Sequence, residues 1–214
     1  MLADAHRHLD PRNEEYVRLN ESELAQLSDE LKLEIIGVLY LPSMNKTPVK
    51  PLAEYTRKSE RAYFLVNDTE PQTVSSFCNY PNFRGIKVYG VTDFSHIPEE
   101  TIEILDNNKL FLMVHGILSP EYVERCLDMY TSVRVIIAHL LGYKQLSSIK
   151  SERLIFDTSA RIGSYFKPNL SLAKRVVEDA CHRLGSDRVV FGSDYDPHYS
   201  KYLPSLTRLQ VLAI

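Results

Sequence analysis

The sequence predicts a compact (β/α)8 barrel, formed by one domain over residues 1–214. Three observations predict this fold: eight short apolar runs, helical patterns between them, and a length that fits a small barrel. A barrel of this class usually needs about 250 residues, with roughly 200 as its lower limit. The loops are therefore expected to be short.

The apolar runs have the character of strands buried on both faces of a parallel sheet. Most are nearly continuous in apolar residues and do not alternate with polar ones, which is typical of such strands. The eight runs are Leu2–His8, Glu34–Leu41, Ala62–Val66, Gly85–Tyr89, Leu110–His115, Val133–His139, Leu154–Thr158 and Val189–Asp194.

Helices are predicted in the gaps between these runs. They cover Asn20–Leu33, Pro98–Asn107, Pro120–Tyr130, Ser171–Leu184 and a short closing helix over Leu203–Ile214. Two of them begin Pro-Glu, which suits the first turn of a helix, and a third stops at Gly185, a common residue just past a helix end. Alternating strands and helices predict a barrel or a doubly wound sheet. A Gly-rich phosphate loop is missing after the first run, which disfavours the dinucleotide-binding fold.

Composition excludes several classes of function. The net charge of −3 lacks the excess of Lys and Arg that nucleic-acid binding needs. The sequence contains no apolar run of membrane-spanning length, and residues 1–10 lack a signal-peptide pattern. Three widely spaced cysteines fit neither a disulfide framework nor a Cys-based zinc site. We therefore expect a cytoplasmic protein with a small-molecule substrate and no nucleic-acid or membrane partner.

Polar residues gather where the predicted strands end. His6 and His8 are two residues apart on the first run, so both side chains should face the same side of the sheet. His115, His139 and Asp194 end the fifth, sixth and eighth runs. Barrel enzymes build their sites at this rim. One such histidine is commonly a core or capping residue, but the five together predict a divalent metal site with an open position for water.

Five ordered motifs carry a family resemblance. They are Asp4-Ala5-His6-Arg7-His8, Gly85-Ile86-Lys87-Val88, Met113-Val114-His115-Gly116, Ile136-Ile137-Ala138-His139-Leu140-Leu141-Gly142 and Asp187-Arg188-Val189-Val190-Phe191-Gly192-Ser193-Asp194. In this order they resemble the amidohydrolase superfamily, in the amidohydrolase 2 branch. That branch contains metal-dependent hydrolases and non-oxidative decarboxylases such as aminocarboxymuconate semialdehyde decarboxylase.

The resemblance implies a role for each rim residue. His6, His8, His115 and Asp194 would hold the metal, and Asp194 would also accept a proton from the attacking water. His139 would act on the substrate, by polarising it or exchanging a proton with it. The segment Asp-Tyr-Asp-Pro-His, which starts at Asp194, is slightly altered from the family's usual Gly-Ser-Asp-Tyr-Pro. Asp196 is therefore a rival, although Asp194 keeps the motif position.

Three further residues are candidates for substrate binding. Arg161 follows the seventh run, and a guanidinium can grip a substrate carboxylate with two hydrogen bonds. His198 lies in the predicted loop after the eighth run, from which it could reach the barrel mouth. Lys87 lies on the fourth run. In some superfamily members this lysine is carboxylated and bridges two metals, while the simpler interpretation is a barrel lysine paired with an acid.

We predict a metal-dependent hydrolase that cleaves an amide, lactone or other ester bond of a small polar substrate with a metal-activated water. One zinc or manganese ion is the expected cofactor, because nitrogen-rich ligation with a carboxylate suits either metal. One alternative is a non-oxidative decarboxylase of a small aromatic or unsaturated acid, and another is a metal-binding barrel without enzymatic activity. Short loops leave the mouth open to water, so a homo-oligomer whose partner supplies a lid also fits.

Overall fold

The structure is a computed structural model that describes residues 2–8, 18, 33–39, 54, 62–90, 92–159 and 170–192. For residues 2–8 and 33–39 it describes the backbone, and their side chains lie outside the described part. The predicted closing helix over Leu203–Ile214 also lies outside it, as does all of Asn20–Leu33 except its last residue.

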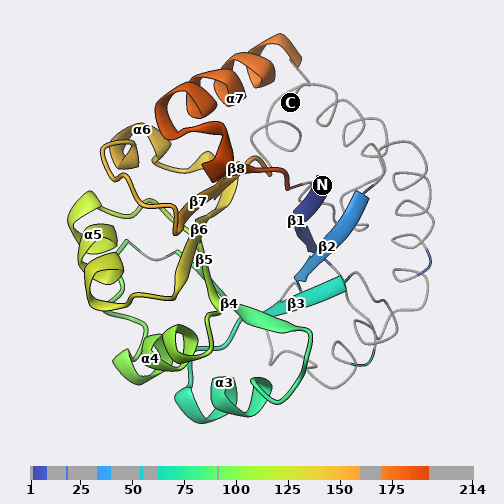
Figure 1. The fold of residues 1–214 in the computed structure, drawn as a ribbon, viewed down its shortest axis with the longest axis vertical. Coiled ribbons are helices and arrows are strands. Elements are labelled where there is room, and N and C mark those ends of the chain that lie inside the picture. The colour runs from blue at the N-terminus through green and yellow to red at the C-terminus, as the bar shows by residue number, and fades with distance from the viewer. Residues whose placement is uncertain are drawn as a thin grey trace.

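Eight parallel strands form one sheet in sequence order, with each strand hydrogen-bonded to the next. They are β1 (Leu2–His8), β2 (Leu33–Leu39), β3 (Ala62–Val66), β4 (Phe83–Tyr89), β5 (Phe111–His115), β6 (Arg134–Ile137), β7 (Leu154–Asp157) and β8 (Val189–Val190). The last strand lies against the first, so the sheet curls round on itself (Figure 1). The fold is the predicted (β/α)8 barrel.

The described helices lie on the outside of the sheet (Figure 1). They are α3 (Pro71–Phe77), α4 (Glu99–Asn107), α5 (Pro120–Met129), α6 (Tyr143–Leu146) and α7 (Leu170–Leu184), with 3₁₀ turns η1 (Ala138–Leu140) and η2 (Ser186–Arg188). Helices α4, α5 and α7 confirm three predictions to within one residue at each end. Helices α3 and α6 were not predicted. The predicted helix Asn20–Leu33 is wrong at its end, because Leu33 is the first residue of β2.

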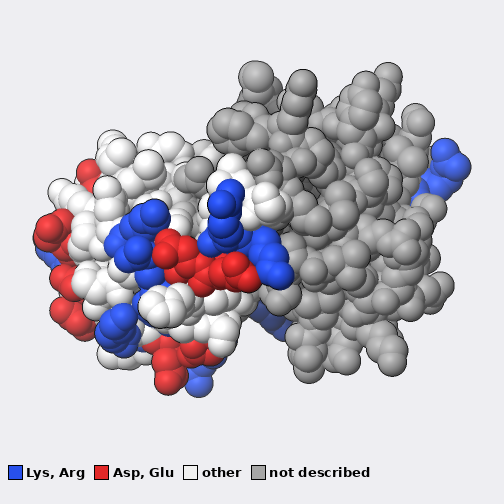
Figure 2. Space-filling model, turned by 90° about the horizontal axis from the view of Figure 1, so that it is seen from above, with Lys and Arg blue, Asp and Glu red and all other residues white. Residues whose placement is uncertain are grey.

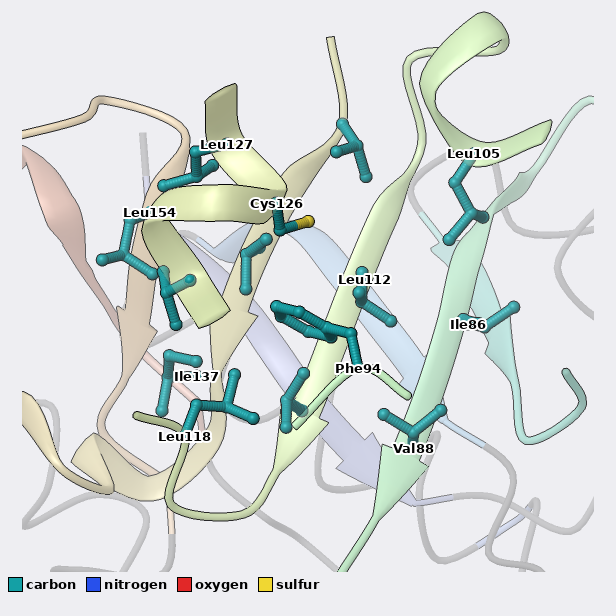
Figure 3. Close-up of a cluster of buried hydrophobic side chains, with 14 of the residues drawn as sticks. Ile86, Val88, Phe94, Leu105, Leu112, Leu118, Cys126, Leu127, Ile137 and Leu154 are labelled. Carbon is teal, nitrogen blue, oxygen red and sulfur yellow. The ribbon is translucent and has the colours of Figure 1, made fainter. Parts of the chain in front are cut away.

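Two apolar clusters hold the sheet in place. The larger one lies between strands and helices, where Ile86 and Leu112 from the sheet pack with Leu105 of α4 and Leu127 of α5 (Figure 3). The smaller one is formed by Leu65, Met113 and Ile136, which belong to β3, β5 and β6. These three residues alternate along their strands with residues of the larger cluster. The smaller cluster is therefore the inside of the barrel.

A buried arginine, Arg188, links chain segments at the end of the barrel where the strands begin, directly before β8. Arg188 donates from Nε to the carbonyl of Leu184 at 2.7 Å and from Nη1 to the carbonyl of Ile149, also at 2.7 Å. The first bond satisfies a carbonyl in the last turn of α7, which has no partner within the helix. The second satisfies a carbonyl in the loop before β7. Burial lowers the pKa of the Arg188 guanidinium below its usual value. The arginine of the Asp187–Asp194 motif thus has a structural task.

The described residues include a surface of mixed charge (Figure 2) and three free cysteines. Acidic and basic side chains lie side by side on the described part of the face seen in Figure 2. Cys78, Cys126 and Cys181 are free thiols, and burial raises the pKa of Cys126 to about 11. Among the helices that the structure describes, none combines the length and apolarity that crossing a bilayer requires.

We expect Gly85→Ala to destabilise the barrel by more than about 4 kcal/mol, a loss that only severe substitutions reach. Gly85 has a φ of +143°, and an added Cβ would lie 1.9 Å from the carbonyl oxygen of Phe111 on β5. The matched control is Gly90→Ala, also at positive φ (+67°) but with no atom within 4 Å of the new Cβ. It should cost only about 1 kcal/mol of backbone strain. Urea unfolding of both variants measures the difference, and equal losses would contradict this account of the β4–β5 contact.

Candidate active site

The sheet places His115 on the inner face of the barrel, at the rim where the C-terminal ends of the parallel strands meet. This rim is called the upper rim. His115 is the last residue of β5, and it follows Met113 of the inner cluster by two residues. Because side chains alternate across a strand, the two share a face, while Leu112 and Val114 point towards the helices. The half-buried imidazole therefore lies where parallel strands end, as predicted for a metal ligand.

Two residues of β4 line the same rim beside His115. Lys87 pairs in register with Met113, and Tyr89 pairs with His115. The Lys87 ammonium nitrogen lies 4.7 Å from the centre of the Tyr89 ring, although Lys87 is only 3% exposed. The Tyr89 ring meets the His115 ring edge to face, with ring centres 5.4 Å apart. Tyr89 therefore joins the predicted lysine to the predicted metal ligand, a role that the sequence analysis did not assign.

His139 is also at the rim, but it does not end a strand. The prediction of a strand over Val133–His139 is wrong at its end, because β6 stops at Ile137 and His139 lies in η1 with φ 61° and ψ 27°. This left-handed conformation is uncommon for residues other than glycine and persists where surrounding contacts hold it. The turn brings the centre of the buried His139 ring to 4.6 Å from the centre of the His115 ring, and the two rings are nearly perpendicular.

A buried carboxylate holds this turn in place. Asp157, the last residue of β7, is fully buried, and its Oδ1 accepts the backbone N–H of His139 at 3.0 Å. The same oxygen accepts the backbone N–H of Ser159 at 2.9 Å and the Ser159 hydroxyl. One carboxylate oxygen therefore fixes both the end of β7 and the strained turn after β6.

Ser159 in turn contacts the imidazole of His139. The Nδ1 of His139 lies 2.8 Å from the Ser159 carbonyl oxygen and 2.9 Å from its hydroxyl oxygen. Neither Asp157 nor Ser159 is among the site residues predicted from the sequence. Their only signal in the sequence was the polar stretch Asp157–Ser159 that follows an apolar run. Their contact with His139 could not be predicted, because it depends on β6 and β7 being neighbours in the sheet.

The remaining predicted site residues are placed less fully. His6 and His8 lie on β1, whose last residue is His8, and their side chains are outside the described part. Since all strands are parallel, β1 ends at the same rim as β5. Asp194, Arg161 and His198 lie outside the described residues. The structure therefore brings together His115, His139 and Lys87 and leaves the other positions as predictions.

The described part of the rim provides imidazole groups, a ligand type that divalent metals accept. Within the described side chains, no group of three or more metal-binding residues is assembled. The imidazole of His115 faces the barrel interior, and the backbone of His6 and His8 reaches the same rim. Imidazoles with a carboxylate are ligands that zinc and manganese accept. Of the predicted ligands, only the side chain of His115 lies within the described part of the chain.

Comparison with solved structures identifies the same fold in amidohydrolase-family proteins. A 2-pyrone-4,6-dicarboxylic acid hydrolase candidate from Pseudomonas putida is 15% identical, with a TM-score of 0.69 over 99% of this chain and 89% of that one. A zinc-bound amidohydrolase from Burkholderia multivorans is 12% identical, with a TM-score of 0.67 over 100% and 91%. An amidohydrolase 2 protein from Bifidobacterium longum subsp. infantis is 13% identical, with a TM-score of 0.62 over 100% and 92%.

Sequence comparison adds no closer relationship. No protein-family model matches the chain, and no curated protein matches it. At 12–15% identity, the structural similarity shows the shared fold. It confirms the barrel that the motif resemblance implies.

Proposed function

We propose that the chain is a metal-dependent hydrolase that cleaves an amide, lactone or other ester bond of a small polar substrate. The observation that carries this proposal is the pair His115 and His139 at the upper rim, with ring centres 4.6 Å apart. His115 ends a strand on the inner face, while the backbone N–H of His139 donates to a buried carboxylate. Such a pair can divide metal binding and proton transfer between two neighbouring histidines.

The proposed cofactor is one zinc or manganese ion held by His6, His8, His115 and Asp194. When bound, a divalent ion polarises the scissile carbonyl and lowers the pKa of a coordinated water towards neutrality. Asp194 is the proposed acceptor of that water's proton. The zinc in the Burkholderia multivorans amidohydrolase of the same fold supports the choice of a divalent metal.

The other proposed roles concern the substrate. His139 exchanges a proton with the substrate, because a fifth protein ligand would close the position where chemistry must occur. Lys87 lies beside the Tyr89 ring at the same rim and offers a cation to an acidic group. Arg161 and His198 remain proposed substrate contacts from the loops after the seventh and eighth strands.

A decarboxylase is the alternative, and Lys87 is the feature that keeps it open. A buried cation at the rim would face a leaving carboxylate as well as it would bind the acid group of a hydrolase substrate. The hydrolase is preferred because structural neighbours carry hydrolase names, including the 2-pyrone-4,6-dicarboxylic acid hydrolase candidate. A screen of lactones, amides, esters and aromatic acids with metal restored separates the two by product, because only decarboxylation releases carbon dioxide.

Metal content tests the ligand assignment. The double variant His6→Ala, His8→Ala should lose the stoichiometric ion, because two of four ligands are removed. Elemental analysis after reconstitution with zinc or manganese measures it, with His182→Ala as the control for loss of an exposed histidine on α7. Unchanged metal in the double variant would refute the assignment. Two ions per wild-type chain would instead favour a bridging, carboxylated Lys87.

Turnover of His139→Asn tests the division of labour between the two rim histidines. We expect this variant to keep its ion and its fold, since Asn tolerates a left-handed backbone better than most residues. Its turnover should fall by about 10²- to 10⁴-fold, the usual contribution of general acid–base catalysis. Steady-state kinetics on the substrate found in the screen measure this loss. If the variant loses its ion as fully as the double variant does, His139 is a metal ligand and the assignment is wrong.

A further inference from the structure

A chain of buried polar groups runs from the end of β7 to the rim. It begins at Asp157 and passes through Ser159 to the imidazole of His139. The first two residues are fully buried and the third is 8% exposed. Buried polar groups need hydrogen-bond partners, so each proton in this chain has a defined place. The positions of the donors therefore determine which nitrogen of His139 carries hydrogen.

The hydroxyl proton of Ser159 is already committed to the carboxylate. Ser159 Oγ donates to Asp157 Oδ1, which also accepts two backbone N–H groups, those of His139 and Ser159. A serine hydroxyl has one hydrogen and two lone pairs. Its oxygen can therefore only accept a hydrogen bond from the imidazole.

The second oxygen that meets the imidazole is a carbonyl, which can only accept as well. His139 Nδ1 lies 2.8 Å from the Ser159 carbonyl oxygen and 2.9 Å from Ser159 Oγ. If Nδ1 carried no hydrogen, its lone pair would face two oxygens that can only accept, and no hydrogen bond would form. The hydrogen must therefore be on Nδ1, and in the neutral ring the lone pair must be on Nε2.

We propose that Asp157 and Ser159 are positioning residues that hold His139 as its Nδ1–H tautomer and present Nε2 as the proton acceptor. Asp157 fixes the left-handed backbone of His139, and Ser159 fixes the ring and its tautomer. This inference rests on the proposed role of His139 in proton exchange. A neutral His139 in the opposite tautomer would offer no lone pair at Nε2 for that exchange.

Histidine NMR tests the tautomer without any substrate. The full chain, labelled with ¹⁵N-histidine, is examined as purified and after zinc addition, at about pH 8, where an ordinary imidazole is neutral. Loss of one spin system in His139→Asn identifies the His139 signals. We expect a protonated Nδ1 and a bare Nε2 in the wild-type protein. A protonated Nε2 would overturn the proposal, even if the protein proves to be an active hydrolase.

The contribution of Ser159 is tested by matched substitutions on one strand end. Ser159→Ala removes the hydroxyl and should lower kcat by about 10- to 100-fold, as is usual for such supporting groups, with KM unchanged. Its Nδ1 proton should also exchange faster with water. Ser159→Thr, which keeps a hydroxyl, should restore both readouts. Thr158→Val is the control, because it removes a neighbouring buried hydroxyl whose contact is the backbone N–H of Gly192.

The outcomes separate this inference from the proposed function. If no hydrolase activity is found but Nδ1 is protonated and its exchange accelerates in Ser159→Ala, the positioning role stands and the assigned reaction fails. If the Ser159→Ala protein matches wild type in proton exchange and kcat, Ser159 is overturned as a positioning residue. If Ser159→Ala does not fold, the wild-type tautomer and the Ser159→Thr comparison still decide, since a protonated Nε2 or a Thr variant without the Nδ1 proton overturns the proposal.

Discussion

A parallel sheet in sequence order places every strand end at one rim, and the candidate site depends on this constraint. Residues that are far apart in the sequence, such as His8 and His115, end strands on the same side only because all eight strands run in the same direction. Close contact between neighbouring strands preserves that order. At Gly85, the backbone of β5 approaches so closely that a side chain would collide with it.

The rim needs a second constraint, because a histidine after a strand is not fixed by the sheet. The carboxylate of Asp157 supplies it. One oxygen accepts the backbone N–H groups of His139 and Ser159, which follow adjacent strands, and also the Ser159 hydroxyl. Hydrogen bonds to a charged acceptor are stronger than neutral ones, which suits a residue that must hold a left-handed turn. The imidazole contact with His115 follows from that turn.

The sequence was informative wherever burial on both faces sets the local pattern. A continuous apolar run predicted β3 with its observed bounds, and the bounds predicted for β1 also match the observed ones. It was less informative where a tertiary contact overrides the pattern. The sequence around His139 does not predict a left-handed backbone there, because the carboxylate that holds this residue lies 18 positions away on β7. Helix α6 has four residues, too few for helical periodicity to appear.

The candidate site divides in the same way. Histidines at strand ends are visible in the sequence, since their position relative to an apolar run is a local property. The tyrosine ring between Lys87 and His115, and the serine beneath His139, are not visible there, because each depends on the register of neighbouring strands. The residues predicted from the sequence are thus those proposed to do chemistry, while the structure adds those that orient them.

Anomalous diffraction at the zinc absorption edge, from crystals of the zinc-loaded full chain, tests whether a metal ion binds where the parallel strands end. We expect one peak at the upper rim, within about 2.1 Å of a His115 ring nitrogen. The peak should lie between the ends of β1 and β5, and His139 should not coordinate the ion. An ion bound through His139, or a rim without any peak while the protein holds zinc elsewhere, would contradict this expectation.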